Sequence, residues 1–309
     1  MRTAIVGAGA MGSLFGAMLA AVSDLCLIDP YEEHVKKICC EGLTVEHADG
    51  SAETHRLTAT ANPADVKPGI DLAIIFTKSC GTAEAARTAK PLLSEKGMVL
   101  TLQNGIGNAE IIADIVGEKQ TLAGVTSHGG TLMGPGRVRH AGTGPTYISP
   151  FSPRTLSAEP VIRLFQKAGI DVHVSDDLQT LVWGKLIINA GINALAAILR
   201  VPNGVLGIKP ECEKIMSAAV AEAVAVANAL HICLPYDNPL AVVKSVCEKT
   251  GPNRASMLQD ILRGADTEVN VINRAIVRKG EELGIPAPCN RFLSEIIEAL
   301  EATSAERLG

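Results

Sequence analysis

The sequence is poor in aromatic residues and has no excess of positive charge. One tryptophan, three tyrosines and five phenylalanines make up 3% of its 309 residues, and the formal net charge is −5. Single-stranded nucleic acids bind by stacking on aromatic side chains, and both nucleic acids and anionic membranes require a basic surface. We therefore expect no nucleic-acid partner, no membrane, and a small polar metabolite as the ligand.

The cysteines lack the spacing of a metal site. The chain has eight of them, without a Cys-x-x-Cys pair and without His/Cys spacing suited to zinc. Most lie among apolar residues, which predicts reduced thiols, a cytoplasmic protein and no metal. An alanine-rich run over 215–234 contains Glu222 and His231, which favours a packed core helix over a membrane span.

Length and composition favour two domains. The hydrophobic fraction of 47% is enough for two cores of ordinary size. Short β-rich runs at 3–7, 25–29, 72–77 and 98–103 alternate with helical runs such as 10–21 and 32–41, and short strands are expected at 125–131, 137–141 and 146–149. Helical periodicity dominates from about residue 176. We expect an α/β fold, with a Rossmann-type dinucleotide-binding domain over 1–175 and an all-helical substrate domain over 176–309.

A glycine-rich loop follows the first expected strand. Its residues are Gly7, Ala8, Gly9, Ala10, Met11 and Gly12. In such a G-x-G-x-x-G loop the first glycine permits the turn, the second admits a pyrophosphate, and the third lets the helix pack on the strand. The loop therefore predicts a dinucleotide site, and the alternative is a purely structural turn.

Asp29 ends the second expected strand, where the adenosine ribose should lie. A carboxylate there accepts hydrogen bonds from the ribose hydroxyls and repels a 2′-phosphate, so it favours NADH over NADPH. The alternative is local, because Asp29-Pro30 is also a good start for a helix.

Three further residues follow strands at the ligand-binding edge of the expected sheet. Lys78 and Asn104 come after apolar strands, and Gly130 could allow close approach of the backbone to a ligand. The alternatives are a solvated loop lysine, an Asn-Gly turn and an ordinary glycine loop.

Lys185, Asn189 and Asn193 form a polar stripe in the apolar stretch 182–199. A step of four residues turns a helix by only about 40° beyond a full turn, so the three side chains share one face. Burying unpaired amides costs about 1–3 kcal/mol each, which indicates a small oxygen-rich ligand. The alternative is that the lysine reaches water and the asparagines pair with a neighbouring helix.

Four more polar residues in the helical half are candidates for the same ligand. These are Asn203, Asn253, Ser256 and Glu268. Their alternatives are a turn residue for Asn203, a helix cap for Asn253 or Ser256, and a solvated position near Arg263 for Glu268.

Together these motifs resemble the ketopantoate reductase (2-dehydropantoate 2-reductase) family over nearly the whole chain. The resemblance rests on the glycine loop and on Thr77-Lys78, Gln103-Asn-Gly-Ile-Gly107, Trp183-Gly-Lys-Leu-Ile-Ile-Asn-Ala-Gly-Ile-Asn193, Pro202-Asn-Gly204, Ser256-Met-Leu-Gln-Asp260 and Thr267-Glu268. It implies reduction of ketopantoate to pantoate in pantothenate biosynthesis, by hydride transfer from a nicotinamide cofactor. It also implies a homodimer formed through the helical domain.

The resemblance assigns a role to each candidate. Lys185 is implied as the proton donor, with Glu268 orienting the amine or the substrate hydroxyl. Lys78, Asn104 and Glu268 are implied to line the nicotinamide side, and Gly130 is a cofactor candidate from its position after a strand alone. The residues implied to contact substrate are Asn104, Lys185, Asn189, Asn193, Asn203, Asn253 and Ser256.

One position departs from the family pattern and keeps rival functions open. Family members that use NADPH usually carry a basic residue where this chain has Asp29. NADH-dependent reduction of another 2-oxo acid, as by D-2-hydroxyacid dehydrogenases of the same fold family, is the closest rival. A β-hydroxyacid dehydrogenase and a nucleotide-sensing regulator without a substrate site are further alternatives.

Overall fold

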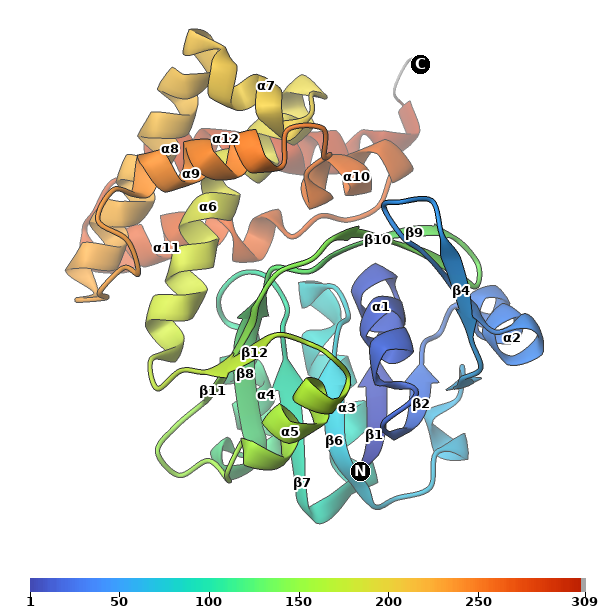
Figure 1. The fold of residues 1–309 in the computed structure, drawn as a ribbon. Helices are drawn as coiled ribbons and strands as arrows, with labels where there is room; N and C mark the ends of the chain where they lie inside the picture. Colours follow the sequence, from blue (N-terminus) through green and yellow to red (C-terminus); the bar gives the residue numbers. More distant parts are fainter. Residues whose placement is uncertain (307–309) are drawn as a thin grey trace. The chain divides into compact units, whose positions relative to one another are not determined.

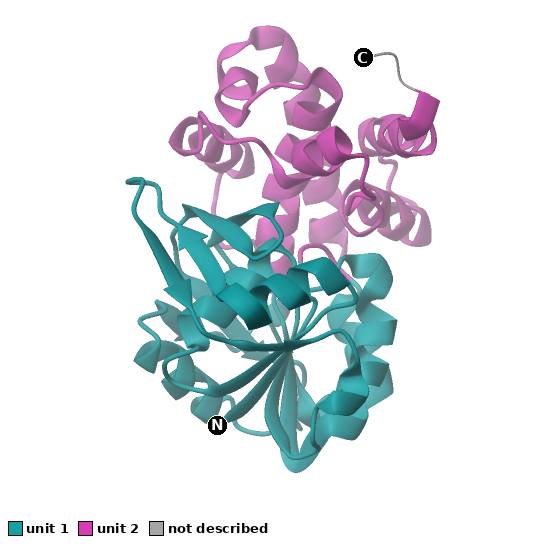
Figure 2. Ribbon diagram, turned by 90° about the vertical axis from the view of Figure 1, so that its right-hand side faces the viewer, with its two compact units in different colours: residues 1–103, 107–178 teal, residues 104–106, 179–309 magenta. Residues whose placement is uncertain are grey.

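The computed structural model describes residues 1–306, which form two compact units (Figure 2). Unit 1 comprises residues 1–103 and 107–178, and unit 2 comprises residues 104–106 and the chain from 179 onward. Unit 1 contains the β-sheets and unit 2 is helical (Figure 1). The expected α/β class with a helical second part is therefore confirmed.

The main sheet of unit 1 has eight strands in the order β12-β11-β8-β7-β6-β1-β2-β5. All neighbouring pairs are parallel except β8 with β11. The strands are β1 Arg2–Val6, β2 Asp24–Ile28, β5 Thr58–Thr60, β6 Ile70–Ile75, β7 Leu93–Thr101, β8 Thr121–Thr126, β11 Thr146–Pro150 and β12 Val172–Val174. Because β1, β2, β6 and β7 run in the same direction, the loops that follow them lie at one edge.

Helices of unit 1 cover both faces of this sheet. They are α1 Ala10–Leu19, α2 Glu32–Glu41, α3 Thr82–Ala89, α4 Asn108–Val116 and α5 Glu159–Lys167. Side chains alternate along β1, so that Ile5 belongs to one apolar cluster while Ala4 and Val6 belong to another. Such two-sided burial explains why the central strands are continuous apolar runs.

A second sheet of four strands was not expected as a separate element. Its order is β4-β3-β10-β9, formed by β3 Leu43–Glu46, β4 Ala52–His55, β9 Gly129–Gly134 and β10 Arg137–Gly142. The single strand expected over 125–131 is wrong, because β8 ends at Thr126 and β9 begins at Gly129 in the other sheet. Between them, the N–H of Ser127 donates to the carbonyl of Pro145 at 2.9 Å and directs the chain away from β8.

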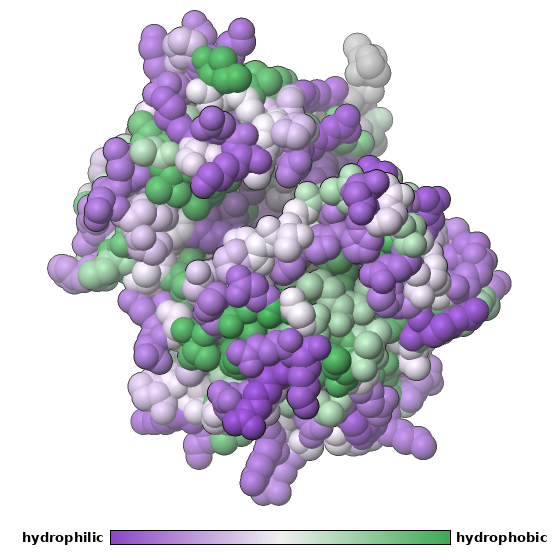
Figure 3. Space-filling view, in the orientation of Figure 1, coloured by the Kyte–Doolittle hydropathy of each residue, from purple (hydrophilic) through white to green (hydrophobic). Residues whose placement is uncertain are grey.

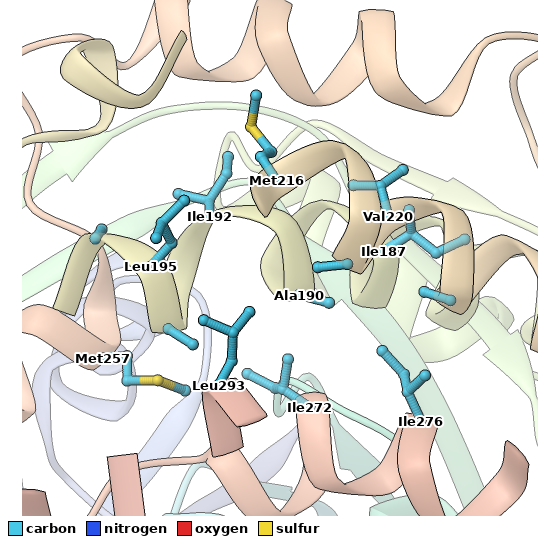
Figure 4. Packing of buried hydrophobic residues seen from close by; sticks show 14 of the residues in the cluster. Ile187, Ala190, Ile192, Leu195, Met216, Val220, Met257, Ile272, Ile276 and Leu293 are labelled. Atoms are coloured by element: carbon cyan, nitrogen blue, oxygen red, sulfur yellow. The ribbon is translucent and has the colours of Figure 1, made fainter. Parts of the chain in front are cut away.

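Unit 2 is built around the long helix α6, Leu178–Leu199. Its other helices are α7 Asn203–Ile208, α8 Pro210–Ala229, α9 Pro239–Lys249, α10 Ser256–Arg263, the short 3-10 helix η5 Val269–Val271, α11 Asn273–Leu283 and α12 Pro288–Ala302. Figure 4 shows Ile187 and Leu195 of α6 among buried side chains from α8, α10 and α11. By length and composition α6 could cross a membrane, but 67% of its apolar window is buried within the protein, as in a core helix.

Residues 104–106 belong to the helical unit although they follow strand β7 of unit 1. The N–H of Ile106 donates to the carbonyl of Val271 at 3.1 Å, and a Cβ on Gly105 would lie 2.4 Å from the same oxygen. Gly105 has a φ of +85°, which only glycine adopts readily. This loop was expected in the first domain, and its contacts with η5 place it in the second unit.

Candidate functional site

The glycine loop of unit 1 has the close packing that its sequence pattern requires. Gly7 has a φ of +95°, and a Cβ there would lie 2.5 Å from the backbone nitrogen of Thr77. A Cβ on Gly12 would lie 1.9 Å from the carbonyl oxygen of Gly7, so α1 packs directly on the turn. Around Gly9, in contrast, no atom of the described residues other than its chain neighbours lies within 4 Å of a built Cβ. The outer side of the loop therefore has open space, as a bound pyrophosphate requires.

The N-terminus of α1 is also suited to an anion. Within residues 1–306, no side chain caps this helix at Gly9, and its first turn contains no acidic residue. Its first N–H groups lack helical acceptors and carry the positive end of the helix dipole. Gly130 of β9 lies beside it, since a Cβ there would be 3.0 Å from the carbonyl oxygen of Ala10. These features fit the phosphates of a dinucleotide.

Asp29 is hydrogen-bonded to the glycine loop. Its Oδ2 accepts from the N–H of Ala8 at 2.6 Å, and its Oδ1 accepts from the N–H of Tyr31 at 2.9 Å. Helix α2 begins after Tyr31, so Asp29 does not occupy the N-cap position suggested by the local alternative. The carboxylate thus lies at the carboxyl end of β2, next to the loop, and has further lone pairs for ribose hydroxyls.

Gln103 joins the ends of β6 and β7, a contact that the sequence did not reveal. Its Nε2 donates to the carbonyl of Thr77 at 2.7 Å and to the Thr82 hydroxyl at 2.9 Å. Lys78 follows Thr77 directly and is exposed at this edge of the sheet. Gln103 therefore fixes the backbone from which Lys78 projects.

The polar stripe of unit 2 lies on one uninterrupted helix. Lys185, Asn189 and Asn193 are all within α6, at the spacing that places them on one face. Asn193 is buried, whereas Lys185 and Asn189 are partly exposed. Burial lowers the pKa of Lys185 from 10.5 to about 8, and the negative charge of Glu268 partly opposes that shift.

Glu268 is a buried carboxylate held by Asn104. Only 8% of Glu268 is exposed, so the solvated position proposed as its alternative is wrong. The Nδ2 of Asn104 donates to Oε2 of Glu268 at 2.9 Å, across a sequence separation of 164 residues. Unit 2 therefore brings Asn104, Glu268 and Lys185 into one electrostatic cluster.

A backbone hydrogen bond joins Asn203 and Asn253. The N–H of Asn203 donates to the carbonyl of Asn253 at 3.0 Å, while the Asn253 side chain is exposed. The Nδ2 of Asn203 donates to the Thr250 hydroxyl at 2.9 Å, and its buried Oδ1 accepts no hydrogen bond within residues 1–306. Ser256 is the exposed first residue of α10, and neither it nor Asn253 caps that helix, whose N-cap is Ala255.

Three side chains around these sites were not among the sequence candidates. Ser13 and His34 lie beneath the glycine loop, and Thr250 holds the amide of Asn203. Ser13 follows the glycine motif by one residue, but His34 and Thr250 have no motif. Their roles depend on contacts between segments far apart in the sequence.

Chemically, the cluster in unit 2 can donate a proton. An amine with a pKa of about 8 is mostly protonated at neutral pH and gives up its proton far more readily than an ordinary lysine. The neighbouring asparagines offer neutral donors and acceptors for a small polar acid. Unit 1 supplies the features of a dinucleotide site.

Family models match both units. The model described as "Ketopantoate reductase PanE/ApbA" matches residues 3–153, and the model for the C-terminal part of the same family matches residues 177–301. The 2-dehydropantoate 2-reductase of Halobacterium salinarum is 35% identical over 299 residues, which cover 96% of this chain and 98% of the relative. That of Archaeoglobus fulgidus is also 35% identical, over 97% and 98% of the two chains.

Solved structures agree over the full length. A PanE/ApbA family ketopantoate reductase from Ralstonia eutropha has a TM-score of 0.90 at 35% identity, covering 99% of this chain and 100% of the other. D-mandelate dehydrogenase, solved with NADH and anilino(oxo)acetate, has a TM-score of 0.91 at 31% identity over the same shares. With both family models matched in order along the chain, this protein belongs to the ketopantoate reductase PanE/ApbA family.

Proposed function

We propose that this protein reduces 2-dehydropantoate to pantoate, with NADH as the preferred hydride donor. The observation that carries the proposal is the cluster of Lys185, Glu268 and Asn104, in which a partly buried amine has a pKa of about 8. Family membership and curated relatives that carry this activity support it. When bound, the reduced nicotinamide supplies a hydride to the carbonyl carbon.

The chain's own residues perform the remaining steps. Lys185 donates its proton to the carbonyl oxygen as negative charge develops there. Glu268 keeps the amine charged and is itself oriented by the Nδ2 of Asn104. Asn189, Asn193 and Ser256 hold the carboxylate and hydroxyl groups through neutral hydrogen bonds, which fixes the carbonyl for attack.

The glycine loop, Lys78, Asn104 and Gly130 are proposed to contact the cofactor. The open space at Gly9 and the uncapped start of α1 suit its pyrophosphate. Asp29, beside Ala8, would accept hydrogen bonds from the ribose hydroxyls and repel a 2′-phosphate. We therefore expect kcat/KM to be at least about tenfold higher with NADH than with NADPH. Equal or better turnover with NADPH contradicts this preference without affecting the proposed reaction.

The buried amide of Asn203 favours ketopantoate over 2-oxo acids with apolar substituents. The Thr250 hydroxyl donates to the carbonyl of Val246 at 2.7 Å, so it accepts from Asn203 Nδ2, and Asn203 Oδ1 has no donor among residues 1–306. An unpaired buried acceptor costs about 1–3 kcal/mol. Ketopantoate has a terminal hydroxyl that can supply the donor, and Asn203 and Asn253 are proposed to lie near that end of the substrate.

A second function is favoured by one specific likeness. D-mandelate dehydrogenase, solved with NADH, is similar over the full chain, and Asp29 suits the same cofactor. The test compares kcat/KM for ketopantoate, 2-oxoisovalerate and benzoylformate, each with NADH and NADPH. The main proposal requires ketopantoate to be the best of the three by about tenfold or more. A higher kcat/KM for benzoylformate would establish the alternative.

We also propose that the protein is a cytoplasmic homodimer formed through unit 2. The described cysteines are all free thiols, in keeping with a reducing compartment. On the face shown in Figure 3, apolar residues form separate patches among mostly polar ones. Ile208 and Phe292 of unit 2 are 77% and 64% exposed. Light scattering should give twice the chain mass of 32.3 kDa, and a monomer at micromolar concentration contradicts the dimer.

A further inference from the structure

In the glycine loop, both the N–H and the carbonyl of Ala8 are hydrogen-bonded to side chains. Its N–H donates to Asp29 Oδ2 at 2.6 Å, and its carbonyl accepts from the Ser13 hydroxyl at 2.7 Å. Only 1% of Ala8 is exposed, so water does not compete for these groups. Two side chains from different elements thus fix the orientation of the peptide groups at the centre of the loop.

The hydrogen bonds continue from Ser13 through His34 to the second sheet. The N–H of Gly136, in the turn between β9 and β10, donates to His34 Nδ1 at 2.9 Å. His34 Nε2 lies 3.0 Å from the Ser13 hydroxyl oxygen. Neither Ser13 nor His34 is more than 1% exposed, so these bonds form inside the protein.

Only one assignment of donors and acceptors satisfies this series of hydrogen bonds. A backbone N–H can only donate, so His34 Nδ1 must accept and its proton must be on Nε2. His34 Nε2–H then donates to Ser13 Oγ, whose own proton is donated to the carbonyl of Ala8. Every polar atom of both side chains is therefore used, and neutral His34 in one tautomer is the form that fits.

The surroundings of His34 keep it neutral. Burial lowers the pKa of His34, against a smaller opposing effect of the Asp29 charge and the Ala8 carbonyl. Tyr31 stacks on the ring, with centroids 6.0 Å apart and planes at 10°. A second proton would place an N–H at Nδ1 against the N–H of Gly136, and the hydrogen bond between His34 and Gly136 would be lost.

From this geometry we infer that His34 and Ser13 are positioning residues for the cofactor. Their hydrogen bonds fix the carbonyl of Ala8, while Asp29 fixes its N–H. The N–H groups of the loop and of the first turn of α1 are thereby oriented toward the pyrophosphate before it binds, which lowers the cost of ordering them. The inference rests on the proposed function, because it takes a nicotinamide dinucleotide as the ligand of this loop.

The test is the dissociation constant of NADH, measured by fluorescence titration of the full chain without substrate. Ser13→Ala removes the hydroxyl that holds Ala8 and should raise Kd about tenfold. In steady-state kinetics the loss should fall on KM for NADH and not on kcat. Ser23→Ala is the matched control, since it removes a serine hydroxyl that donates to Thr3 Oγ1 at 2.7 Å, where β2 begins, and it should leave Kd unchanged.

Two variants of His34 test whether its hydrogen bond to Ser13 matters for NADH binding, or only its packing in the fold. The amide of His34→Gln can reach the site of Nε2 and still donate to Ser13, whereas that of His34→Asn reaches only the site of Nδ1 and still accepts from Gly136. We expect NADH Kd within about twofold of wild type for His34→Gln and raised about tenfold for His34→Asn.

Three outcomes are distinguishable. Unchanged Kd in Ser13→Ala, or equal weakening in the two His34 variants at similar Tm, overturns the inference while leaving the proposed function in place. If one His34 variant fails to fold, the NADH Kd of Ser13→Ala compared with that of Ser23→Ala still tests the inference. Failure of wild type to bind NADH or NADPH would contradict the proposed function itself.

Discussion

Lys185 has a lowered pKa that a purely structural role would not require. Burial lowers its pKa to about 8, and donation requires the protonated amine. Activity should therefore be constant below this pH and fall tenfold per pH unit well above it. The measurement is kcat/KM for ketopantoate between pH 6 and 10 at saturating NADH. A flat profile up to pH 10 contradicts the assignment of Lys185 as the acid.

Glu268 should control where that decline begins. Its charge raises the pKa of Lys185, so Glu268→Gln should move the decline to lower pH while the amide still accepts from Asn104. The matched control is Asp266→Asn, because Asp266 is exposed and its charge is screened by solvent. An unshifted pH profile in Glu268→Gln would show that the two side chains are not coupled.

The same linkage affects folding stability. The pKa of Lys185 is lower in the folded protein than in the unfolded chain, so the folded state binds fewer protons between pH 8 and 10.5. The contribution of this residue to stability is therefore full above pH 10.5 and is lost as the pH falls toward 8. Replacing Lys185 with methionine should remove this part of the pH dependence of unfolding by urea.

In the glycine loop and helix α1, fold and function can be separated. A Cβ on Gly12 would lie 1.9 Å from the Gly7 carbonyl oxygen, whereas one on Gly9 would have only its chain neighbours within 4 Å in the described part of the chain. Gly12→Ala should lower the free energy of unfolding by about 3 kcal/mol, as overpacking of a close contact does. Gly9→Ala should leave Tm within a few degrees of wild type and weaken NADH binding about tenfold or more, because its methyl group enters the space for the pyrophosphate.

Thermal unfolding and NADH titration of both variants check this prediction. A stable Gly12→Ala variant would mean that α1 does not pack on the loop as described. Normal NADH binding by Gly9→Ala would mean that the pyrophosphate does not approach there.

Sequence patterns predicted the elements that have strong local signals. The strands around the glycine loop and the long helix with Lys185 and Asn189 follow from hydrophobic runs and spacing. Strand β4, with the sequence Ala-Glu-Thr-His, was missed because it is mostly exposed and polar and is held by backbone pairing with β3. Its partners cannot be read from its own residues.

The polar networks were less predictable, because they join distant segments. Asn104 was a candidate from its position after a strand, but its bond to Glu268 spans 164 residues. His34 is one of seven histidines, and nothing in its local sequence distinguishes it as the partner of Ser13 and Gly136. Such roles follow only from the tertiary structure.

Across the whole molecule, the features of the proposed reaction are divided between the two units. Unit 1 has the features of a dinucleotide site around Gly9 and Asp29, and unit 2 has Lys185, the proposed proton donor, with its polar stripe. We therefore expect that cofactor binding and proton donation can be lost independently. A variant at Gly9 should leave the pKa of Lys185 unchanged, and a variant at Lys185 should leave the NADH Kd unchanged.

The most direct test of this account is Lys185→Ala, assayed with ketopantoate and NADH at pH 7. A general acid contributes about 10²- to 10⁴-fold, so kcat should fall by that factor while the NADH Kd stays within about twofold of wild type. Near-normal turnover in this variant would contradict the role of the Lys185 amine of α6 as the proton donor.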